Sequence, residues 1–73
     1  MASGTGESVY KVVEVIGTST RSWDDAAKNA VETASRKLRE LRIAEVVKFD
    51  IKIEKGKVLT YRALLRLSFK YEH

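Results

Sequence analysis

The sequence of 73 residues contains no cysteine, no proline and a single histidine, His73, which is its last residue. Without thiols there is no disulfide, and no zinc-ligand spacing of Cys and His occurs. A glycine-rich phosphate loop is also missing, because Gly17-Thr18-Ser19 is too short to be one. With no catalytic histidine, thiol or nucleotide loop, the sequence predicts that the protein is not an enzyme.

The chain also lacks long apolar segments. No run approaches the roughly 18 apolar residues that span a bilayer, and the N-terminus has neither a basic start nor an apolar export segment. Residues 1–7 are small, polar and glycine-bearing, which predicts a flexible tail before a single domain over residues 8–73. We expect a cytoplasmic protein with no membrane partner, since a chain without cysteine suits a reducing compartment.

The short length limits how stable a single copy can be. A chain of this size buries only about 60% of the surface that it exposes when unfolded, so its own core is marginal. Small domains compensate with disulfides, a structural metal or oligomerisation. Because this chain has no cysteine and only a terminal histidine, self-association is the expected remedy.

Local patterns predict one strand, one helix and two further strands. Val9 to Ile16 is rich in β-branched residues and ends at the Gly17-Thr18-Ser19 turn. Ser22 offers a side-chain oxygen to the first free amides of a helix, with Asp25 three residues on, so the helix should begin at Trp23. Apolar positions at steps of three and four predict its buried face: Trp23, Ala27, Ala30, Val31, Ala34, Leu38 and Leu41.

The other two strands alternate and are joined by a hairpin turn at Lys55-Gly56-Lys57. Their apolar faces are predicted as Glu45, Val47, Phe49, Ile51 and Ile53, and as Leu59, Tyr61, Ala63, Leu65, Leu67, Phe69 and Tyr71. A right-handed crossover lets the third strand lie between the other two. The predicted fold class is α+β, with the order β-α-β-β and a three-stranded antiparallel or mixed sheet wrapped around one helix. Long open edges favour pairing between subunits, with the strand from Leu59 to Tyr71 as the oligomer-building element, and Leu65→Asp should break assembly if the apolar face of this strand is buried.

Basic residues outnumber acidic ones by 14 to 10, which gives a net charge of +4. The densest cluster falls at the expected end of the helix, where cations complement the helix dipole, and this explanation is favoured over a phosphate-binding patch: Arg36, Lys37, Arg39 and Arg42. Basic strand residues leave a nucleic-acid-binding module as an alternative: Lys48, Lys52, Arg62, Arg66 and Lys70. The aromatic residues fall on the apolar faces, away from any base-stacking surface, which makes nucleic acid unlikely as a partner.

Several blocks occur in the order and spacing of one known family. They are Val9-Tyr10-Lys11-Val12-Val13-Glu14-Val15-Ile16-Gly17-Thr18-Ser19, Ser22-Trp23-Asp24-Asp25-Ala26-Ala27, Ala44-Glu45-Val46-Val47, Thr60-Tyr61-Arg62 and Leu67-Ser68-Phe69. Through these blocks the chain resembles the dodecins. The resemblance implies a hollow homododecamer that binds and stores a small ligand without catalysis, the usual ligand being a flavin such as FMN or riboflavin.

The resemblance also locates a ligand pocket, made of Ile43, Glu45 and Arg62. In flavin-binding dodecins a Trp at the position of Ile43 stacks on the flavin, and a Gln at the position of Arg62 pairs with the edge of the ring. A guanidinium only donates and is always charged, so Arg62 cannot reproduce that pairing and flavin binding is weakened. We expect Arg62 to pair with Glu45 or another carboxylate, and Trp23 to pack in the core instead of stacking on a flavin.

Three alternatives to flavin remain open: an anionic or aromatic ligand of the Arg62 pocket, calcium, which is associated with some variant dodecins, or a shell without a small ligand. Calcium takes about six to eight oxygen ligands, which symmetry-related copies of one carboxylate can supply. The candidate metal ligands are Asp24, Asp25, Glu45, Asp50 and Glu54, none with an EF-hand spacing.

Overall fold

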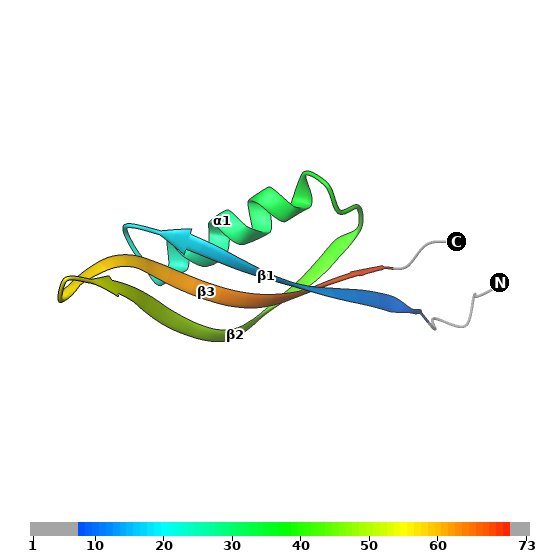
Figure 1. The fold of residues 1–73 in the computed structure, drawn as a ribbon. Helices are drawn as coiled ribbons and strands as arrows, with labels where there is room; N and C mark the ends of the chain where they lie inside the picture. The colour runs from blue at the N-terminus through cyan, green and yellow to red at the C-terminus, as the bar shows by residue number, and fades with distance from the viewer. Residues whose placement is uncertain (1–7, 71–73) are drawn as a thin grey trace.

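The computed structural model describes residues 8–70. Its elements are, in chain order, β1 (Tyr10–Ser19), α1 (Trp23–Ser35), β2 (Leu41–Glu54) and β3 (Lys57–Lys70) (Figure 1). β3 lies between β1 and β2 and pairs antiparallel with both. The predicted β-α-β-β order and sheet topology are therefore confirmed. The predicted tail over residues 1–7, together with Tyr71 and His73, lies outside the described residues.

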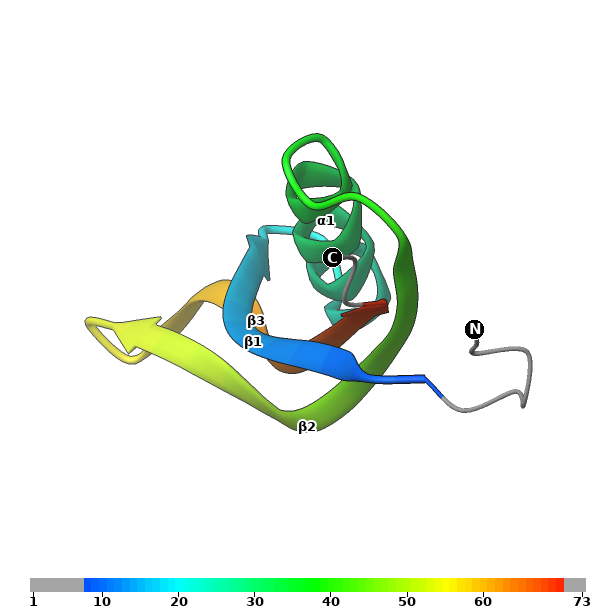
Figure 2. The same cartoon turned by 90° about the vertical axis from the view of Figure 1, so that its right-hand side faces the viewer.

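The sheet curves around the helix, which lies on its concave side (Figure 2). α1 packs against β1 and β3 and hardly touches β2. The closest approach is at Gly17 of β1, where an added Cβ would lie 2.1 Å from the carbonyl oxygen of Ala26 and 2.8 Å from the Cβ of Ala30. The predicted alanine-rich helix face thus allows close packing on β1, while the concave side of β2 stays uncovered.

The core is small. Within residues 8–70 the buried apolar side chains are Ala26, Ala30, Ala63, Leu65 and Leu67, and only the two leucines are large. Leu65 is 1% exposed in the single chain. The apolar face of β3 is therefore buried at Leu65, but by α1 of the same chain, so Leu65→Asp perturbs the subunit core before it can test assembly. Trp23, predicted in the helix core, is 37% exposed, and Ala26 takes the fully buried position on this face.

The helix ends earlier than its apolar pattern predicts. α1 stops at Ser35, so Leu38 lies in the following turn and Leu41 opens β2. After Ser35 the chain turns, and Glu40 takes a left-handed φ of 59° just before β2 begins. The basic cluster consequently begins at the C-cap, with no basic residue in the last helical turn. Across residues 8–70 no helix has the length and apolar character needed to cross a membrane.

β2 departs from strict alternation. The register with β3 shifts between Val46 and Lys48, so Val46 lies opposite Leu65 while Phe49 lies opposite Ala63. Directly opposed residues share a face of the sheet. Val46 and Phe49 are thus both on the concave side, and Glu45, opposite Arg66, is on the convex side. The predicted face that grouped Glu45 with Phe49 was wrong, because a β-bulge at Val47 reverses the pattern.

Candidate functional site

The convex face of the sheet carries an ion pair between β3 and β2. Arg62 Nε donates to Asp50 Oδ1 at 2.7 Å, and Arg62 Nη2 donates to Asp50 Oδ2 at 3.0 Å. The two residues are opposed in the strand register, and both side chains are a little over one third exposed. The hydrogen bond from Arg62 lowers the pKa of Asp50, and the carboxylate in turn raises the pKa of Arg62. The acidic partner expected for Arg62 is therefore Asp50.

Arg66 forms a second ion pair on the convex face, next to the Arg62–Asp50 pair. Arg66 Nε donates to Glu14 Oε2 of β1 at 2.9 Å. Glu45 lies opposite Arg66 on β2, and its charge adds to that of Glu14 in raising the pKa of Arg66. Arg66 is thus flanked by one carboxylate from each edge strand. Both central arginines of the convex face are neutralised within the chain.

The single chain does not bring the predicted pocket together. Ile43 lies opposite Ser68, whereas Arg62 lies opposite Asp50. Six residues of strand separate Ser68 from Arg62, a distance of about 20 Å. Ile43 and Glu45 share the convex face, and Ile43 is exposed. A pocket that contains both Ile43 and Arg62 requires a contribution from another copy.

The carboxylates predicted as metal ligands are also dispersed. Within residues 8–70 no group of three or more His, Cys, Asp or Glu side chains could hold a metal ion. Asp50 is held by Arg62, and Asp25 by a polar network at the start of α1. Asp24 and Glu45 are exposed and accept no hydrogen bond from the part of the chain that the structure describes. Residues 8–70 of one copy therefore do not bring together the about six to eight oxygen ligands that calcium takes.

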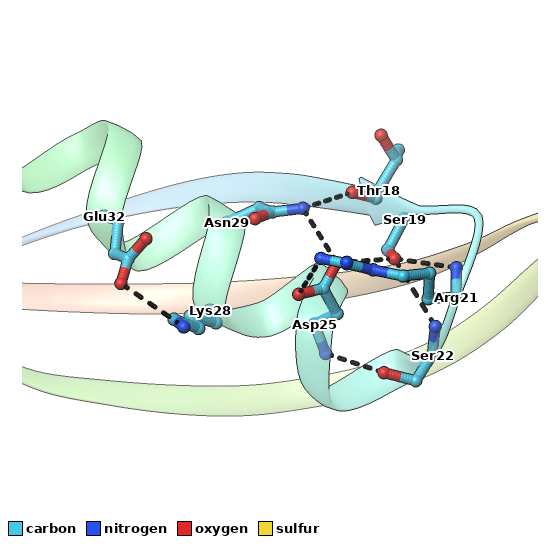
Figure 3. A network of polar contacts seen from close by, with 8 residues as sticks. All are labelled: Thr18, Ser19, Arg21, Ser22, Asp25, Lys28, Asn29 and Glu32. Atoms are coloured by element: carbon cyan, nitrogen blue, oxygen red, sulfur yellow. Dashed lines mark hydrogen bonds and ion pairs between the residues drawn. The ribbon is translucent and has the colours of Figure 1, made fainter.

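Asp25 anchors the end of β1 to the helix (Figure 3). The Ser19 hydroxyl donates to Asp25 Oδ2 at 2.7 Å, and Arg21 Nη2 donates to Asp25 Oδ1 at 3.0 Å. The backbone N–H of Asp25 donates to Ser22 Oγ at 3.0 Å, which confirms the predicted N-cap. Asn29 Nδ2 donates to the Thr18 carbonyl at 3.0 Å. Asp25 is thereby a structural carboxylate.

Acid should weaken this network. Hydrogen bonds from Ser19 and then Arg21 lower the pKa of Asp25 below its ordinary 3.8. A lowered carboxyl pKa contributes stability above the unfolded pKa, and that stability is lost as the pH falls through the folded pKa. We expect Asp25→Asn to lower the melting temperature at pH 6, with the difference from wild type shrinking below about pH 4. Thermal unfolding across pH measures this, with Asp24→Asn as the control; an Asp25→Asn difference that is constant with pH would contradict it.

Trp23 is fixed by two aromatic rings and one hydrogen bond. Its ring meets Tyr61 edge-on at 5.2 Å and Phe49 at a tilt at 5.8 Å between centroids. Trp23 Nε1 donates to the carbonyl oxygen of Asp50 at 3.1 Å. The indole is therefore engaged in packing α1 on β2 and β3, as the sequence predicted, although part of it stays exposed. It also links the helix start to the Arg62–Asp50 pair, a connection that no local pattern indicates.

A groove of about 450 Å³ between β1 and α1 was also missing from the sequence predictions. It is lined by Val15, Ile16, Gly17, Thr18, Asn29, Ala30, Thr33, Ala34 and Lys37. None of the predicted site residues lines it. The residues come from two elements whose side chains meet only after folding, so no spacing along the chain reveals the groove.

Comparisons with known proteins agree on one family. The dodecin family model matches residues 9–72. The chain is 43% identical to the calcium dodecin of Mycobacterium tuberculosis over 63 residues, which covers 86% of this chain and 89% of that protein.

Solved structures give the same result. The structure is similar to dodecin from Streptomyces coelicolor, with a TM-score of 0.87 and 40% identity over 93% of this chain and 97% of the other. A calcium-chelating dodecin from Mycobacterium tuberculosis, described as having a novel calcium-binding site, matches with a TM-score of 0.79 and 44% identity over 89% and 93%. The sequence resemblance is thereby confirmed: the chain belongs to the dodecin family, whose members bind small ligands and form oligomers, and are not known as enzymes.

Proposed function

We propose that this dodecin is a cytoplasmic shell of twelve copies that binds and stores calcium in place of flavin. The observation that carries the proposal is the paired state of Arg62. Its guanidinium makes two hydrogen bonds to Asp50, at 2.7 and 3.0 Å, at the position where the flavin-pairing amide stands in flavin-binding dodecins. The Arg62 guanidinium therefore cannot pair with the edge of a flavin ring as an amide does, and it is already hydrogen-bonded to Asp50.

The other flavin determinant is also absent. Ile43 stands where flavin-binding dodecins have the stacking Trp, and it offers no aromatic plane. Trp23, the only tryptophan, is held by Tyr61, Phe49 and the Asp50 carbonyl. A pocket formed by Ile43, Glu45 and Arg62 between copies would thus present an aliphatic side chain and paired charges. Such a surface favours neither stacking nor pairing with an isoalloxazine ring.

Calcium fits the remaining carboxylates better. The relative with 43% identity is named a calcium dodecin, and the similar solved structure carries a calcium-binding site. Of the five candidates, Asp25 and Asp50 are paired with Arg21 and Arg62, whereas Asp24, Glu45 and Glu54 are exposed, and Glu54 lies apart from the others at the β2–β3 hairpin. Copies of one carboxylate around a symmetry axis can supply several oxygen ligands. We assign Asp24 and Glu45 as calcium ligands, with further oxygen ligands supplied by a second copy of the chain.

The apolar surface supports assembly. Among residues 8–70, twelve large apolar side chains are exposed, more than twice the number of buried apolar residues. Val46 and Phe49 on the concave side of β2 are 42% and 48% exposed, because α1 lies mainly over the other two strands and contacts Phe49 only at one side, through Trp23. Surface of this kind in a chain with so small a core is typical of a subunit. Twelve copies are the number that the family resemblance implies.

Titration calorimetry of the assembled protein after chelation tests the proposal. We expect saturable calcium binding and no quenching of riboflavin or FMN fluorescence. Asp24→Asn or Glu45→Gln should lower the calcium affinity more than the roughly 10- to 100-fold lost when an outer-shell partner is removed. Glu32→Gln, an exposed carboxylate paired only with Lys28, is the matched control and should bind calcium normally. Flavin quenching without calcium binding would contradict the proposal.

The flavin half of the proposal has a separate test. Ile43→Trp combined with Arg62→Gln restores both the stacking plane and the amide, so the assembled double variant should quench riboflavin fluorescence. Ile43→Trp combined with Arg62→Lys keeps the new indole and a donor-only cation, and should quench far less. Absence of quenching in a correctly assembled Trp and Gln variant would show that these two positions are not what excludes flavin.

A further inference from the structure

The positive charge of the chain is concentrated in one short segment. Residues 36–42 contain Arg36, Lys37, Arg39 and Arg42 with Glu40 as the only acid, a net charge of +3 out of +4 for all 73 residues. The first five of these residues form the α1–β2 loop, residues 36–40, which connects Ser35 to Leu41. The rest of the chain is close to electrically neutral.

The basic side chains of this loop differ from the other arginines of the chain in whether they have a carboxylate partner. Four of the six arginines donate to carboxylates: Arg21 to Asp25, Arg42 to Glu40, Arg62 to Asp50 and Arg66 to Glu14. The remaining two are Arg36 and Arg39. Among residues 8–70, neither they nor Lys37 form an ion pair, and all three are exposed. The one loop carboxylate, Glu40, is hydrogen-bonded by Arg42, and the charge of Arg39 also helps to lower the pKa of Glu40, so one acid faces four basic residues in this segment.

This arrangement changes which surface can attract a polyanion. The sequence alone pointed to basic residues on β2 and β3, but Arg62 and Arg66 of that set are neutralised by Asp50 and Glu14. Lys48 also lies near Asp50, whose pKa it helps to lower. The strand surface is therefore close to balanced in charge. The unbalanced positive surface is the α1–β2 loop, at the opposite end of the molecule from the β2–β3 hairpin (Figure 1).

We propose that the α1–β2 loop is a docking surface for the phosphate backbone of a nucleic-acid duplex. Arg36, Lys37 and Arg39 form no ion pair within residues 8–70, and their guanidinium and ammonium groups can donate to phosphate oxygens. The loop contains no aromatic residue on which an unpaired base could stack, so it contacts the backbone without reading the sequence. In an oligomer the loop is repeated on every copy, and simultaneous contacts raise the overall affinity.

Salt dependence of duplex binding is the direct test. A short fluorescein-labelled DNA duplex is titrated with the assembled protein, and anisotropy is followed at about 50 and about 200 mM salt. Three phosphate contacts from one copy give a slope of about −2.7 in log affinity against log salt, a loss of about 40-fold over that range. The triple variant Arg36→Gln, Lys37→Gln, Arg39→Gln should lose this contribution, whereas Arg36→Lys with Arg39→Lys should keep it.

The hairpin provides a matched control. Lys52→Gln, Lys55→Gln and Lys57→Gln remove the same charge from exposed positions at the other end of the molecule, and should leave the salt slope unchanged. Equal losses in the two triple variants would overturn the proposal, since net charge alone would then govern binding. Competition by ATP at the same phosphate concentration as the duplex would also overturn it, by showing a site for free phosphate groups. Gel filtration confirms that every variant keeps the wild-type size.

Discussion

Gly17→Ala should destabilise the protein by about 3 kcal/mol, at the upper end of the cost of overpacking a tight interface. The added Cβ would meet the Ala26 carbonyl oxygen at 2.1 Å and the Ala30 Cβ at 2.8 Å. The nearer atom belongs to the helix backbone, so it cannot move away as a flexible side chain would. Either α1 lifts from β1 or the strand bends, and each opens the small core around Ala63, Leu65 and Leu67. Urea unfolding at fixed protein concentration measures the loss.

Gly56→Ala is the control for this prediction. At Gly56 an added Cβ meets nothing within 4 Å, but φ is +76°, so the substitution strains the turn by about 1–2 kcal/mol without a clash. The two variants have the same chemical change, and they compare a steric clash at Gly17 with backbone strain alone at Gly56. If Gly17→Ala costs no more than Gly56→Ala, the close approach of β1 to the helix does not limit this fold.

Val46→Asp should break the oligomer while leaving the subunit folded. Val46 is on the concave side of β2, the strand that α1 covers least, and is 42% exposed in the single chain. If another copy covers this surface, each interface must bury a carboxylate at a cost of several kcal/mol or dissociate. We expect a much smaller particle by gel filtration with the circular dichroism of folded subunits. A particle of wild-type size would show that this part of β2 is not an interface.

Two substitutions calibrate that result. Leu65→Asp places a carboxylate in the buried core of the same chain, where the side chain is 1% exposed, and should unfold the subunit instead of only dissociating it. Thr20→Asp adds the same charge at an exposed turn and should preserve both size and fold. The three variants together separate loss of assembly from loss of folding.

Much of the fold was predictable because its signals are local. The β-branched run before Gly17, the cap at Ser22 and the hairpin turn at Gly56 each depend on residues a few positions apart. The bulge at Val47 depends on how β2 pairs with β3, and no signal within β2 marks it. The apolar pattern continues to Leu41, so it does not mark the helix end at Ser35, after which the chain turns through the left-handed Glu40.

The sequence indicated that Arg62 would have an acidic partner, but it did not indicate that the partner is Asp50. Counting back from the hairpin turn, where Glu54 pairs with Lys57, places Phe49 opposite Arg62. A register shift between Lys52 and Ile53 puts Asp50 there instead. The Ser19–Asp25 bond likewise joins residues on a strand end and a helix that meet only in the folded chain. Such contacts follow from strand register and packing, which a single sequence does not fix.

Native mass spectrometry of the untreated purified protein tests the central claim most directly. One spectrum reports the number of subunits and the mass of any retained ligand. We predict a particle of twelve subunits that carries calcium and no flavin, and that loses the extra mass after treatment with a chelator. A twelve-subunit particle with retained flavin would contradict the inferred effect of Ile43 and Arg62, and a monomer or dimer would contradict the assembly on which the calcium site depends.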